Sequence, residues 1–251
     1  FDKLGVQPTA QFIRPLETGH EALFVLPIEA NLLKQETMQL EDSSPLARLW
    51  DIDVIDHNGN LLSRADFNFP LRPCLVCSEN AKNCARSRKH HLDEIFAQMQ
   101  KRVQAVDFAD QIAELAYAAL LSEARLSPKP GLVDSINNGS HKDMNLHTFE
   151  QSALALKPFF SIFVLEGMKT AEDPSSQILR QIRPLGLQAE QAMLQSTEQV
   201  NTHKGAIFAF GLVCTAIGRL YQQHRLAMNV EQICEMVAKF TQGLCAELQY
   251  F

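Results

Sequence analysis

Residues Ser127 to Met144 read SPKPGLVDSINNGSHKDM and separate two segments rich in helix-forming residues. The stretch combines proline, glycine and asparagine, which favour turns, with lysine, histidine and aspartate. Charged and turn-forming residues between helices are typical of a functional loop. Asn201 to Gly205 (NTHKG) repeats the His-Lys pair directly before a long apolar segment. We therefore predict two loops that meet and form a site for a polyphosphate.

The segments on either side of these loops predict helices. Apolar residues recur there at helical spacing, and no strand pattern follows residue 100. We expect helices at residues 91–106, 107–125, 146–167, 177–197, 207–221 and 230–249, with Asp107 as the N-cap of the second. The longest uncharged run, residues 205–218, is shorter than the roughly 20 residues that span a membrane, and it predicts a buried core helix.

Residues 1–75 favour strands instead. Residues 22–28 form a short apolar run, and residues 36–42 and 47–56 alternate between polar and apolar side chains. Asn58-Gly59 signals a type I′ turn, after which residues 61–67 return as a second strand. We expect an α+β domain at residues 1–105, with an antiparallel hairpin plus helix, followed by an all-α helical domain at residues 106–251.

Asp51 and Asp53 stand two positions apart in the expected strand, so both carboxylates would project from one face. Apolar Ile55 shares this face, which predicts that the two carboxylates are partly buried. Unpaired carboxylates in such a place are costly, so we expect a cation to bind them. A carboxylate pair on a rigid strand suits Mg²⁺, and nucleotidyltransferases hold a metal in this way against a phosphate. The neighbouring candidates for phosphate contact are Arg48 and Arg64. The alternative is a solvent-facing strand with ordinary charges.

Three cysteines, Cys74, Cys77 and Cys84, are spaced C-x2-C-x6-C and are followed by His90. Cysteine and histidine are the ligands of structural Zn²⁺ sites, and C-x2-C is a good half-site. The second half of the pattern is irregular, so reduced cysteines without a metal are an alternative. Another alternative is a phosphate-binding cluster formed by the neighbouring arginines, Arg72, Arg86 and Arg88.

The cysteine content also bears on the compartment. Six cysteines without a secretory signal indicate a reduced, cytoplasmic protein.

The expected polyphosphate site draws cations from both loops. Lys129 stands between two prolines, which stiffen its backbone, and Gly205 opens a helix whose N-terminus can bind an anion. The candidate phosphate ligands are Lys129, Gly131, Lys142, Lys204 and Gly205, and the candidate Mg²⁺ ligands are Asp134 and Asp143. Glycines at 131 and 139 allow positive φ or close approach. The loops lack the GxxxxGK[ST] motif, and the alternative is a pair of solvated loops whose histidines cap helices.

Composition excludes some classes of partner. The chain is 46% hydrophobic and 21% charged, an ordinary composition for a soluble protein. Its formal net charge of −6 gives no support for nucleic acid or a membrane surface as a partner.

Several longer motifs resemble known families. RLWDIDV (Arg48–Val54) and RPCLVCSENAKNCARSRKHH (Arg72–His91) resemble the apo-citrate lyase phosphoribosyl-dephospho-CoA transferase family. SPKPGLVDSINNGSHKDM (Ser127–Met144) and NTHKGAIFAFGL (Asn201–Leu212) resemble the triphosphoribosyl-dephospho-CoA synthase family. Together they resemble a bifunctional fusion that makes and attaches the prosthetic group of citrate lyase.

The resemblance of the helical half implies a reaction between ATP and 3′-dephospho-CoA. A ribose 2′-hydroxyl of dephospho-CoA would attack the anomeric carbon of the ATP ribose and release adenine. The resemblance implies that Lys129, Lys142 and Lys204 bind the triphosphate and that Asp134 or Asp143 binds metal. It further implies His141 or His203 as the acid that protonates adenine.

The resemblance of the first half implies transfer of the product to a carrier protein. A serine of the citrate lyase acyl carrier subunit would attack the α-phosphate and displace pyrophosphate. Asp51 and Asp53 would hold Mg²⁺, and Arg48 would contact the phosphates.

The chain departs from the two families at three points. The transferase motif usually has glycine before its arginine, whereas this chain has Ala47. Both families extend further, the first before residue 1 and the second after residue 251, so we expect a fragment truncated at both ends, which could be inactive as it stands. The alternatives are a malonate decarboxylase-type enzyme making the same group and a zinc-stabilised module that binds an acyl carrier protein without catalysis.

Overall fold

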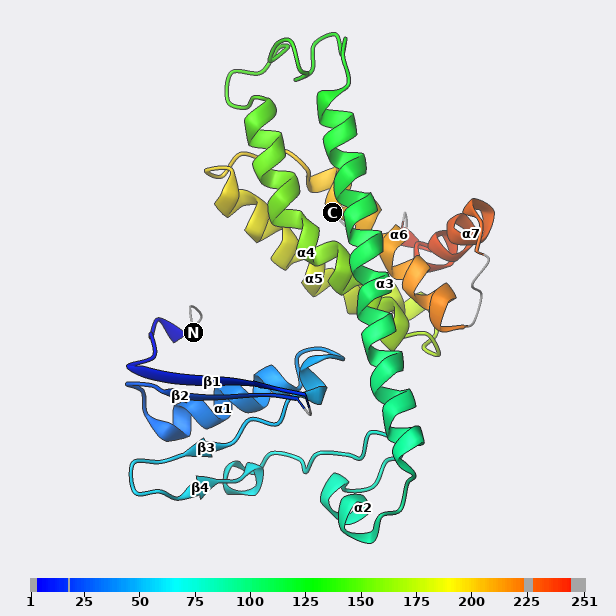
Figure 1. Ribbon diagram of the computed structural model, residues 1–251. Helices are drawn as coiled ribbons and strands as arrows, with labels where there is room; N and C mark the ends of the chain where they lie inside the picture. The colour runs from blue at the N-terminus through cyan, green and yellow to red at the C-terminus, as the bar shows by residue number, and fades with distance from the viewer. Residues whose placement is uncertain (1–3, 18, 224–227, 245–251) are drawn as a thin grey trace. The chain divides into compact units, whose positions relative to one another are not determined.

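The computed structural model describes residues 4–17, 19–223 and 228–244. The chain divides into two compact units, residues 1–103 and 104–251, here called unit 1 and unit 2. Helix α3 (Leu92–Arg125) contributes residues to both units. Strands and short helices occupy unit 1, and every described regular element of unit 2 is a helix (Figure 1). The predicted α+β part followed by an all-helical part is confirmed.

Unit 1 is built from short elements. Strands β1 (Ala10–Leu16) and β2 (Gly19–Val25) form an antiparallel pair in which Ala10 lies opposite Val25 (Figure 1, dark blue). Nearly every residue of this pair is exposed. The other elements are α1 (Ala30–Glu41), η2 (Ala47–Leu49), β3 (Val54–Ile55), β4 (Leu61–Leu62), η3 (Arg64–Phe67) and α2 (Ala81–Ser87).

The strand expected at residues 36–42 is wrong, because these residues belong to α1 and the turn after it. The Glu29 carboxylate accepts the N–H of Asn31 at 3.2 Å and caps the helix. The buried side chains of α1 are Lys34, Met38 and Glu41, whose spacing of four and three is helical. The alternation over residues 36–42 covers only seven positions, so it fits a helix as well as a strand.

The strand expected at residues 47–56 is also largely wrong. Residues 47–49 form a 3-10 helix, residues 50–53 have no regular structure, and only Val54 and Ile55 pair as a strand. The partner strand is equally short because Ser63 ends it. The Ser63 N–H donates to the Asp66 carboxylate at 2.8 Å in a capping box that starts η3.

The predicted hairpin exists, but its turn differs from the predicted type. Val54 pairs with Leu62 and Ile55 with Leu61, leaving a five-residue connection. The Gly59 N–H donates to the Asp56 carbonyl at 3.0 Å, and Gly59 has φ +85° while Asn58 does not have positive φ. A type I′ turn needs positive φ at both central residues. Here the Asp56 carboxylate also accepts the N–H groups of Asn58 and Asn60, which stabilises the longer connection.

Helix α3 runs without interruption through the expected break at Asp107. Asp107 lies exposed in its interior, so the predicted N-cap is wrong. A stripe of buried small and apolar residues continues past this point at helical spacing, and it keeps the helix regular. These residues are Ala109, Ala113, Ala116, Leu120 and Ala124.

Unit 2 is a bundle of the second part of α3 with α4 (Leu146–Lys169), α5 (Ser175–Ser196), α6 (Lys204–Gln222) and α7 (Val230–Phe240). Helices α4 and α6 pack closely against each other in this bundle. A Cβ atom on Gly167 would lie 2.1 Å from the Thr215 carbonyl oxygen, and one on Gly218 would lie 1.9 Å from that of Val164. The two backbones therefore touch directly, and the apolar side chains around them form one core.

Helix α6 is the expected core helix. By length and composition alone it could cross a membrane, but half of the relevant window is buried within the protein. Ile207, Leu212 and Leu220 belong to the same buried cluster as residues of α4 and α5. The last expected helix, 230–249, ends at Phe240, and its part beyond residue 244 lies outside the described residues.

Candidate functional site

The two His-Lys loops meet in unit 2, as predicted. They line a pocket of about 480 Å³ together with residues of α3, α4 and α6. The first loop joins the ends of α3 and α4, and the second leads into α6 (Figure 1). The polar and glycine residues of the pocket lining are Glu123, Lys129, His141, Thr202, His203 and Gly205. The pocket therefore collects one ammonium, one carboxylate and two imidazole groups among apolar side chains.

Asp134 organises the first loop. Its Oδ1 accepts the N–H groups of Ile136 and Asn137 at 2.8 and 2.9 Å, and its Oδ2 accepts from Ser127 Oγ and the Lys129 N–H at 2.9 and 3.0 Å. These donors, the Asn137 N–H foremost, hold the pKa of the buried carboxyl well below its usual range. Both oxygens are occupied, so this geometry gives Asp134 a scaffolding role and does not support the expected role as a Mg²⁺ ligand.

Gly131 and Gly139 make the loop fold back on itself. Both have positive φ, +79° and +57°. A Cβ on Gly139 would lie 2.5 Å from the Gly131 carbonyl carbon, and the Ser140 N–H donates to the Gly131 carbonyl at 3.1 Å. The expected need for glycine at both positions is confirmed.

Lys129 reaches across the pocket wall to the end of α3. Its ammonium donates to the Glu123 carbonyl at 2.8 Å and pairs with the Glu123 carboxylate at 3.0 Å. The side chain is only 11% exposed, so the charge is held in place rather than free in solvent. An anion in the pocket would meet a cation whose position is already fixed.

His203 is buried at the base of the pocket and is tied to α4. Its Nδ1 lies 2.7 Å from Ser152 Oγ, and Thr202 Oγ1 donates to the same Ser152 oxygen at 2.7 Å. Ser152 accepts from Thr202, so its own hydrogen is free to donate to Nδ1, and in that arrangement the proton of neutral imidazole is on Nε2. Nε2 is buried without a hydrogen-bond partner among the described residues. Burial lowers the pKa of His203 to about 4, so the ring is neutral at pH 7.

The remaining members of the first loop are more exposed. His141 Nδ1 lies 3.9 Å from an Asp143 carboxylate oxygen, and Asp143 is 64% exposed. Lys142 is exposed, and neither Lys142 nor Asp143 lines the pocket. The structure therefore brings together Lys129, His141, His203 and Gly205 but not Lys142 or Asp143.

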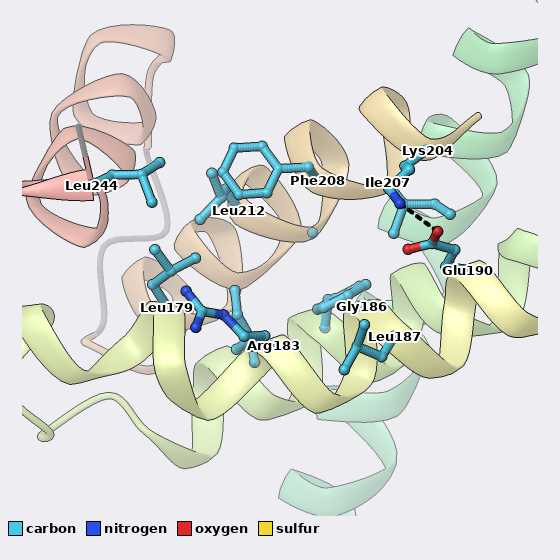
Figure 2. Close-up of a pocket in the computed structure, with 13 residues that line it drawn as sticks. Leu179, Arg183, Gly186, Leu187, Glu190, Lys204, Ile207, Phe208, Leu212 and Leu244 are labelled. Carbon is cyan, nitrogen blue, oxygen red and sulfur yellow. Dashed lines mark ion pairs between the residues drawn. The ribbon is translucent and has the colours of Figure 1, made fainter. Parts of the chain in front are cut away.

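Lys204 points away from this pocket, so the expected set of three lysines is not assembled. It lies at one end of a groove of about 200 Å³ between α5 and α6, with Leu187 and Ile207 nearby (Figure 2). Its ammonium pairs with the Glu190 carboxylate at 2.7 Å, and the side chain is 62% exposed. Adjacent residues at the start of a helix project about 100° apart, which explains why His203 and Lys204 face different cavities.

In unit 1, Asp51 and Asp53 lie on the irregular segment before β3 and not on a strand. Both are exposed, so the expected partial burial is wrong. Asp51 Oδ1 pairs with Arg72 at 3.0 Å while remaining 88% exposed, and among the described residues Asp53 has no hydrogen bond or ion pair. The carboxylates are accessible to a cation. Because they are solvated, they do not need a bound cation to offset a cost of burial.

Arg64 belongs to a buried network and not to an open phosphate site. It pairs with the Glu41 carboxylate at 2.9 Å and with Asp42, and its side chain is 11% exposed. Glu41, itself 4% exposed, also accepts the Ile52 N–H at 2.9 Å and lies 3.7 Å from Arg72. These contacts hold the segment that carries Asp51 and Asp53 against α1.

Arg48 faces a second cavity, of about 570 Å³, which the cysteine region also lines. Its guanidinium donates to the Pro73 carbonyl. Burial and the charges of Arg72 and Arg102 lower the pKa of Arg48. Cys74, Cys84 and His90 share the lining of this cavity.

Comparison with known proteins divides the chain into two parts, close to the boundary between unit 1 and unit 2. The sequence model of the apo-citrate lyase phosphoribosyl-dephospho-CoA transferase family matches residues 1–106. That of the ATP:dephospho-CoA triphosphoribosyl transferase family matches residues 109–250, more than half of the chain. The chain is a fused member of these two families.

Named relatives agree with this assignment. "Protein CitXG" of Haemophilus influenzae is 61% identical over 256 aligned residues, which cover 100% of this chain and 55% of the relative. The 2-(5''-triphosphoribosyl)-3'-dephosphocoenzyme-A synthase of Haemophilus ducreyi is 57% identical over 70% of this chain and 58% of its own length. "Protein CitXG" of Leuconostoc mesenteroides is 34% identical over 97% of this chain and 54% of its own length. The chain thus spans just over half the length of these curated relatives.

In unit 2, the prediction from sequence missed Ser152, Thr202 and Glu123. Ser152 lies 51 positions from His203 and looks like an ordinary small residue inside an apolar helix. Thr202 stands inside the quoted NTHKG motif, so its position beside the histidine was a usable signal. In unit 1 the missed residue is Glu41, which lay in a segment predicted as a strand.

Proposed function

We propose that unit 2 catalyses transfer of a triphosphoribosyl group from ATP to 3′-dephospho-CoA. The observation that carries this proposal is the pocket in which both family motifs meet around Lys129, His141 and His203. The 2′-hydroxyl of dephospho-CoA forms a bond to the anomeric carbon of the ATP ribose, and the bond from that carbon to adenine breaks. The hydroxyl proton is released, and adenine leaves after taking up a proton, so the triphosphate remains on the new product.

The residues of the pocket suit different parts of this reaction. Lys129 and the N-terminus of α6 at Gly205 are placed to bind phosphate oxygens. His203 is neutral and offers an Nε2–H, so it serves as a fixed hydrogen-bond donor that orients the substrate. His141, which is half-buried at the pocket rim, is the candidate acid for adenine. This assignment separates the two histidines that the sequence left as alternatives.

We propose that unit 1 transfers the product to a serine of the citrate lyase acyl carrier subunit. The serine oxygen bonds to the α-phosphorus, the bond to pyrophosphate breaks, and the serine proton is lost. Exposed Asp51 and Asp53 are the residues that would hold Mg²⁺, whose charge would offset that of the phosphates. Arg48 would contact the phosphates from its cavity. This part rests on the family match and on the accessibility of these side chains.

Metal binding differs between the two units. The donors around Asp134 leave no free oxygen for Mg²⁺, so no step in unit 2 is assigned to a metal held by that residue. Asp143, exposed and outside the pocket lining, is the remaining candidate in unit 2. A Zn²⁺ ion at the cysteines of unit 1 would have four protein ligands and no open position, so it would be structural and take no part in either reaction.

The remaining assignments follow from these activities. The domain division is proposed at residues 1–105 and 106–251, with the transferase before the synthase. Partners are ATP, 3′-dephospho-CoA and the acyl carrier subunit, and the compartment is the cytoplasm, where these metabolites occur. A malonate decarboxylase-type role is not favoured, since the matched transferase family is that of citrate lyase.

The test measures free adenine and the intact mass of apo-acyl carrier subunit in one reaction. It contains this chain, ATP, 3′-dephospho-CoA and Mg²⁺, with the Haemophilus influenzae relative as a positive control. We expect adenine release together with a carrier mass increase of one phosphoribosyl-dephospho-CoA group. An active relative beside a chain that gives neither product would reject the proposal for this chain.

Matched variants resolve the two activities. Lys129→Ala should reduce adenine release at least tenfold, a loss of about 1.4 kcal/mol of transition-state stabilisation, while Lys204→Ala stays within about threefold of the parent. Asp53→Asn should abolish the carrier mass shift and leave adenine release intact. Equal losses in the two lysine variants, or loss of both products in Asp53→Asn, would contradict this placement of the sites.

A further inference from the structure

Four ligand-type atoms converge in unit 1, beside the cavity that Arg48 faces. The three thiols of Cys74, Cys77 and Cys84 and the imidazole of His90 each offer one atom, and these atoms all lie within 4.8 Å of one another. Cys77 Sγ lies 3.7 Å from Cys84 Sγ, and His90 Nε2 lies 3.3 Å from Cys77 Sγ. A tetrahedral ion with Zn–S distances of about 2.3 Å and a Zn–N distance of about 2.0–2.1 Å separates its sulfurs by about 3.8 Å and sulfur from nitrogen by about 3.5 Å. The Cys77–Cys84 and Cys77–His90 separations are thus close to those of a closed tetrahedral site.

The local fold delivers these atoms from three different elements. Cys74 and Cys77 lie in a tight loop closed by the Cys74 N–H donating to the Glu79 carbonyl at 2.7 Å. The Val76 N–H approaches Cys74 Sγ at 3.5 Å, so the loop directs a backbone donor at a sulfur, as suits a thiolate. Cys84 is buried on α2.

The end of α2 then turns the chain so that the histidine returns to the cluster. Arg88 adopts a left-handed conformation with φ +48° and terminates the helix. His90 follows two residues later, with a side chain only 12% exposed. Its other ring nitrogen, Nδ1, lies 3.9 Å from the Glu94 carboxylate, one turn into the next helix. A carboxylate on the far side of a ligand histidine is a recurrent feature of zinc sites, since it fixes the orientation of the ring.

Charge around the cluster also suits a bound dication. Three thiolates with Zn²⁺ carry a net charge of −1, and the guanidinium groups of Arg48 and Arg88 line the adjoining cavity. His90 Nε2, 3.3 Å from Cys77 Sγ, lies where the fourth ligand of such a site is required.

We propose that Cys74, Cys77, Cys84 and His90 form a structural Zn²⁺ site that fixes the segment between η3 and α3, which includes α2. The ion would hold Cys74 in place, and the preceding residue, Pro73, accepts a hydrogen bond from Arg48. The site would therefore also position Arg48, a consequence that rests on the transferase role proposed for unit 1. Zinc binding itself does not depend on that role.

The first measurement is the metal content of the whole chain purified without chelators. We expect one Zn²⁺ per chain, and replacement by Co²⁺ should give the intense ligand-field bands of tetrahedral cobalt with thiolate charge-transfer bands. Cys77→Ser should lose the metal, while Cys234→Ser, which alters an exposed cysteine of α7, should keep it. Absence of zinc, or a mass two hydrogens lower that shows a Cys77–Cys84 disulfide, would overturn the proposal.

A second pair of variants covers the case in which Cys77→Ser fails to fold. His90→Cys keeps four ligands, so it should bind one ion and shift the cobalt bands as nitrogen is replaced by sulfur. The neighbouring exposed residue provides the control, and His91→Cys should leave the spectrum of the parent unchanged. A spectrum unaffected by His90→Cys would show that His90 is no ligand. If metal content behaves as expected but carrier modification is absent, the zinc site stands and only the transferase proposal fails.

Discussion

The two units are stabilised by different forces. In unit 2 the backbones of α4 and α6 touch at Gly167 and Gly218, and apolar side chains fill the space around that contact. In unit 1 the strands of the longest hairpin are exposed, and the buried groups include the charged side chains of Lys34 and Glu41. Apolar close packing thus determines the geometry of one site and a polar network that of the other. The units should therefore respond to different perturbations.

The largest expected effect is in unit 2. Gly218→Ala places a methyl group 1.9 Å from the Val164 carbonyl oxygen, where only backbone could move. We expect a loss of more than about 3 kcal/mol in the free energy of unfolding, because helices cannot separate locally without opening the core. Far-UV circular dichroism during denaturation measures this loss, since most helical residues lie in unit 2.

Gly186→Ala is the matched control, because a Cβ there meets no atom within 4 Å. Its helix should become more stable by up to about 1 kcal/mol. The single tryptophan, Trp50, reports unit 1 by fluorescence, and its transition should be unchanged in both variants. A Gly218→Ala chain that unfolds like the parent would show that the helices are less tightly packed than the structure indicates.

The next effect is in unit 1 and involves charge. Glu41→Gln leaves the buried guanidinium of Arg64 paired only with Asp42 and weakens the contact with Arg72. Breaking one partner of a buried ion pair costs about 3 kcal/mol, because the other charge stays desolvated. Trp50 fluorescence should show the loss, and the far-UV transition of unit 2 should not. An equal shift of both transitions would remove the distinction between the units.

A somewhat smaller effect depends on pH. Burial lowers the pKa of His203 from 6.5 to about 4, so between these values the unfolded chain binds a proton that the folded chain does not. Stability of unit 2 should therefore fall as pH decreases from 6.5 towards 4, by about 2–3 kcal/mol for this group.

Denaturation of the parent and of His203→Asn at pH 7 and pH 4 isolates this contribution. The variant should lose less stability on acidification than the parent does. His147→Asn, which alters an exposed histidine of α4, is the control and should follow the parent. Identical acid sensitivity in all three proteins would mean that His203 is not held neutral by burial.

The smallest expected effect is at the surface of unit 1. Arg14 and Glu21 pair at 2.9 Å across β1 and β2, with side chains 53% and 64% exposed. An exposed ion pair contributes about 0.5 kcal/mol or less, because solvent screens it. Glu21→Gln should therefore leave the Trp50 transition almost unchanged, in contrast to Glu41→Gln. A large effect would show that exposure is a poor guide to the forces in this unit.

The sequence predicted the helical part better than the strand-containing part, for a physical reason. Helix α4 was anticipated because more than 20 residues carry a consistent apolar period, which a few exceptions do not obscure. In unit 1 the elements are short, and an alternation such as that of residues 36–42 also fits a helix. Strand β4 ends where Ser63 caps η3 in a capping box with Asp66, a local S-x-x-D signal that the strand prediction did not take into account.

In the candidate sites, features that depend on neighbouring residues were predicted, and contacts between residues far apart in the sequence were not. The cysteines were grouped because C-x2-C is a local spacing, and the meeting of the two loops followed from their shared motif. The direction of Lys204 could not be predicted, since it depends on which side of α6 faces α5. The contact of Ser152 with His203 joins residues 51 positions apart and required the folded chain.

The direct backbone contact between α4 and α6 has a consequence for hydrogen exchange. Amide hydrogens of residues 164–168 and 211–218 lie where solvent can enter only if the helices separate. Exchange there should require the largest opening of unit 2, whereas the exposed hairpin of β1 and β2 should exchange through small local fluctuations. The slowest-exchanging amides of unit 2 would thus trace the contact between α4 and α6.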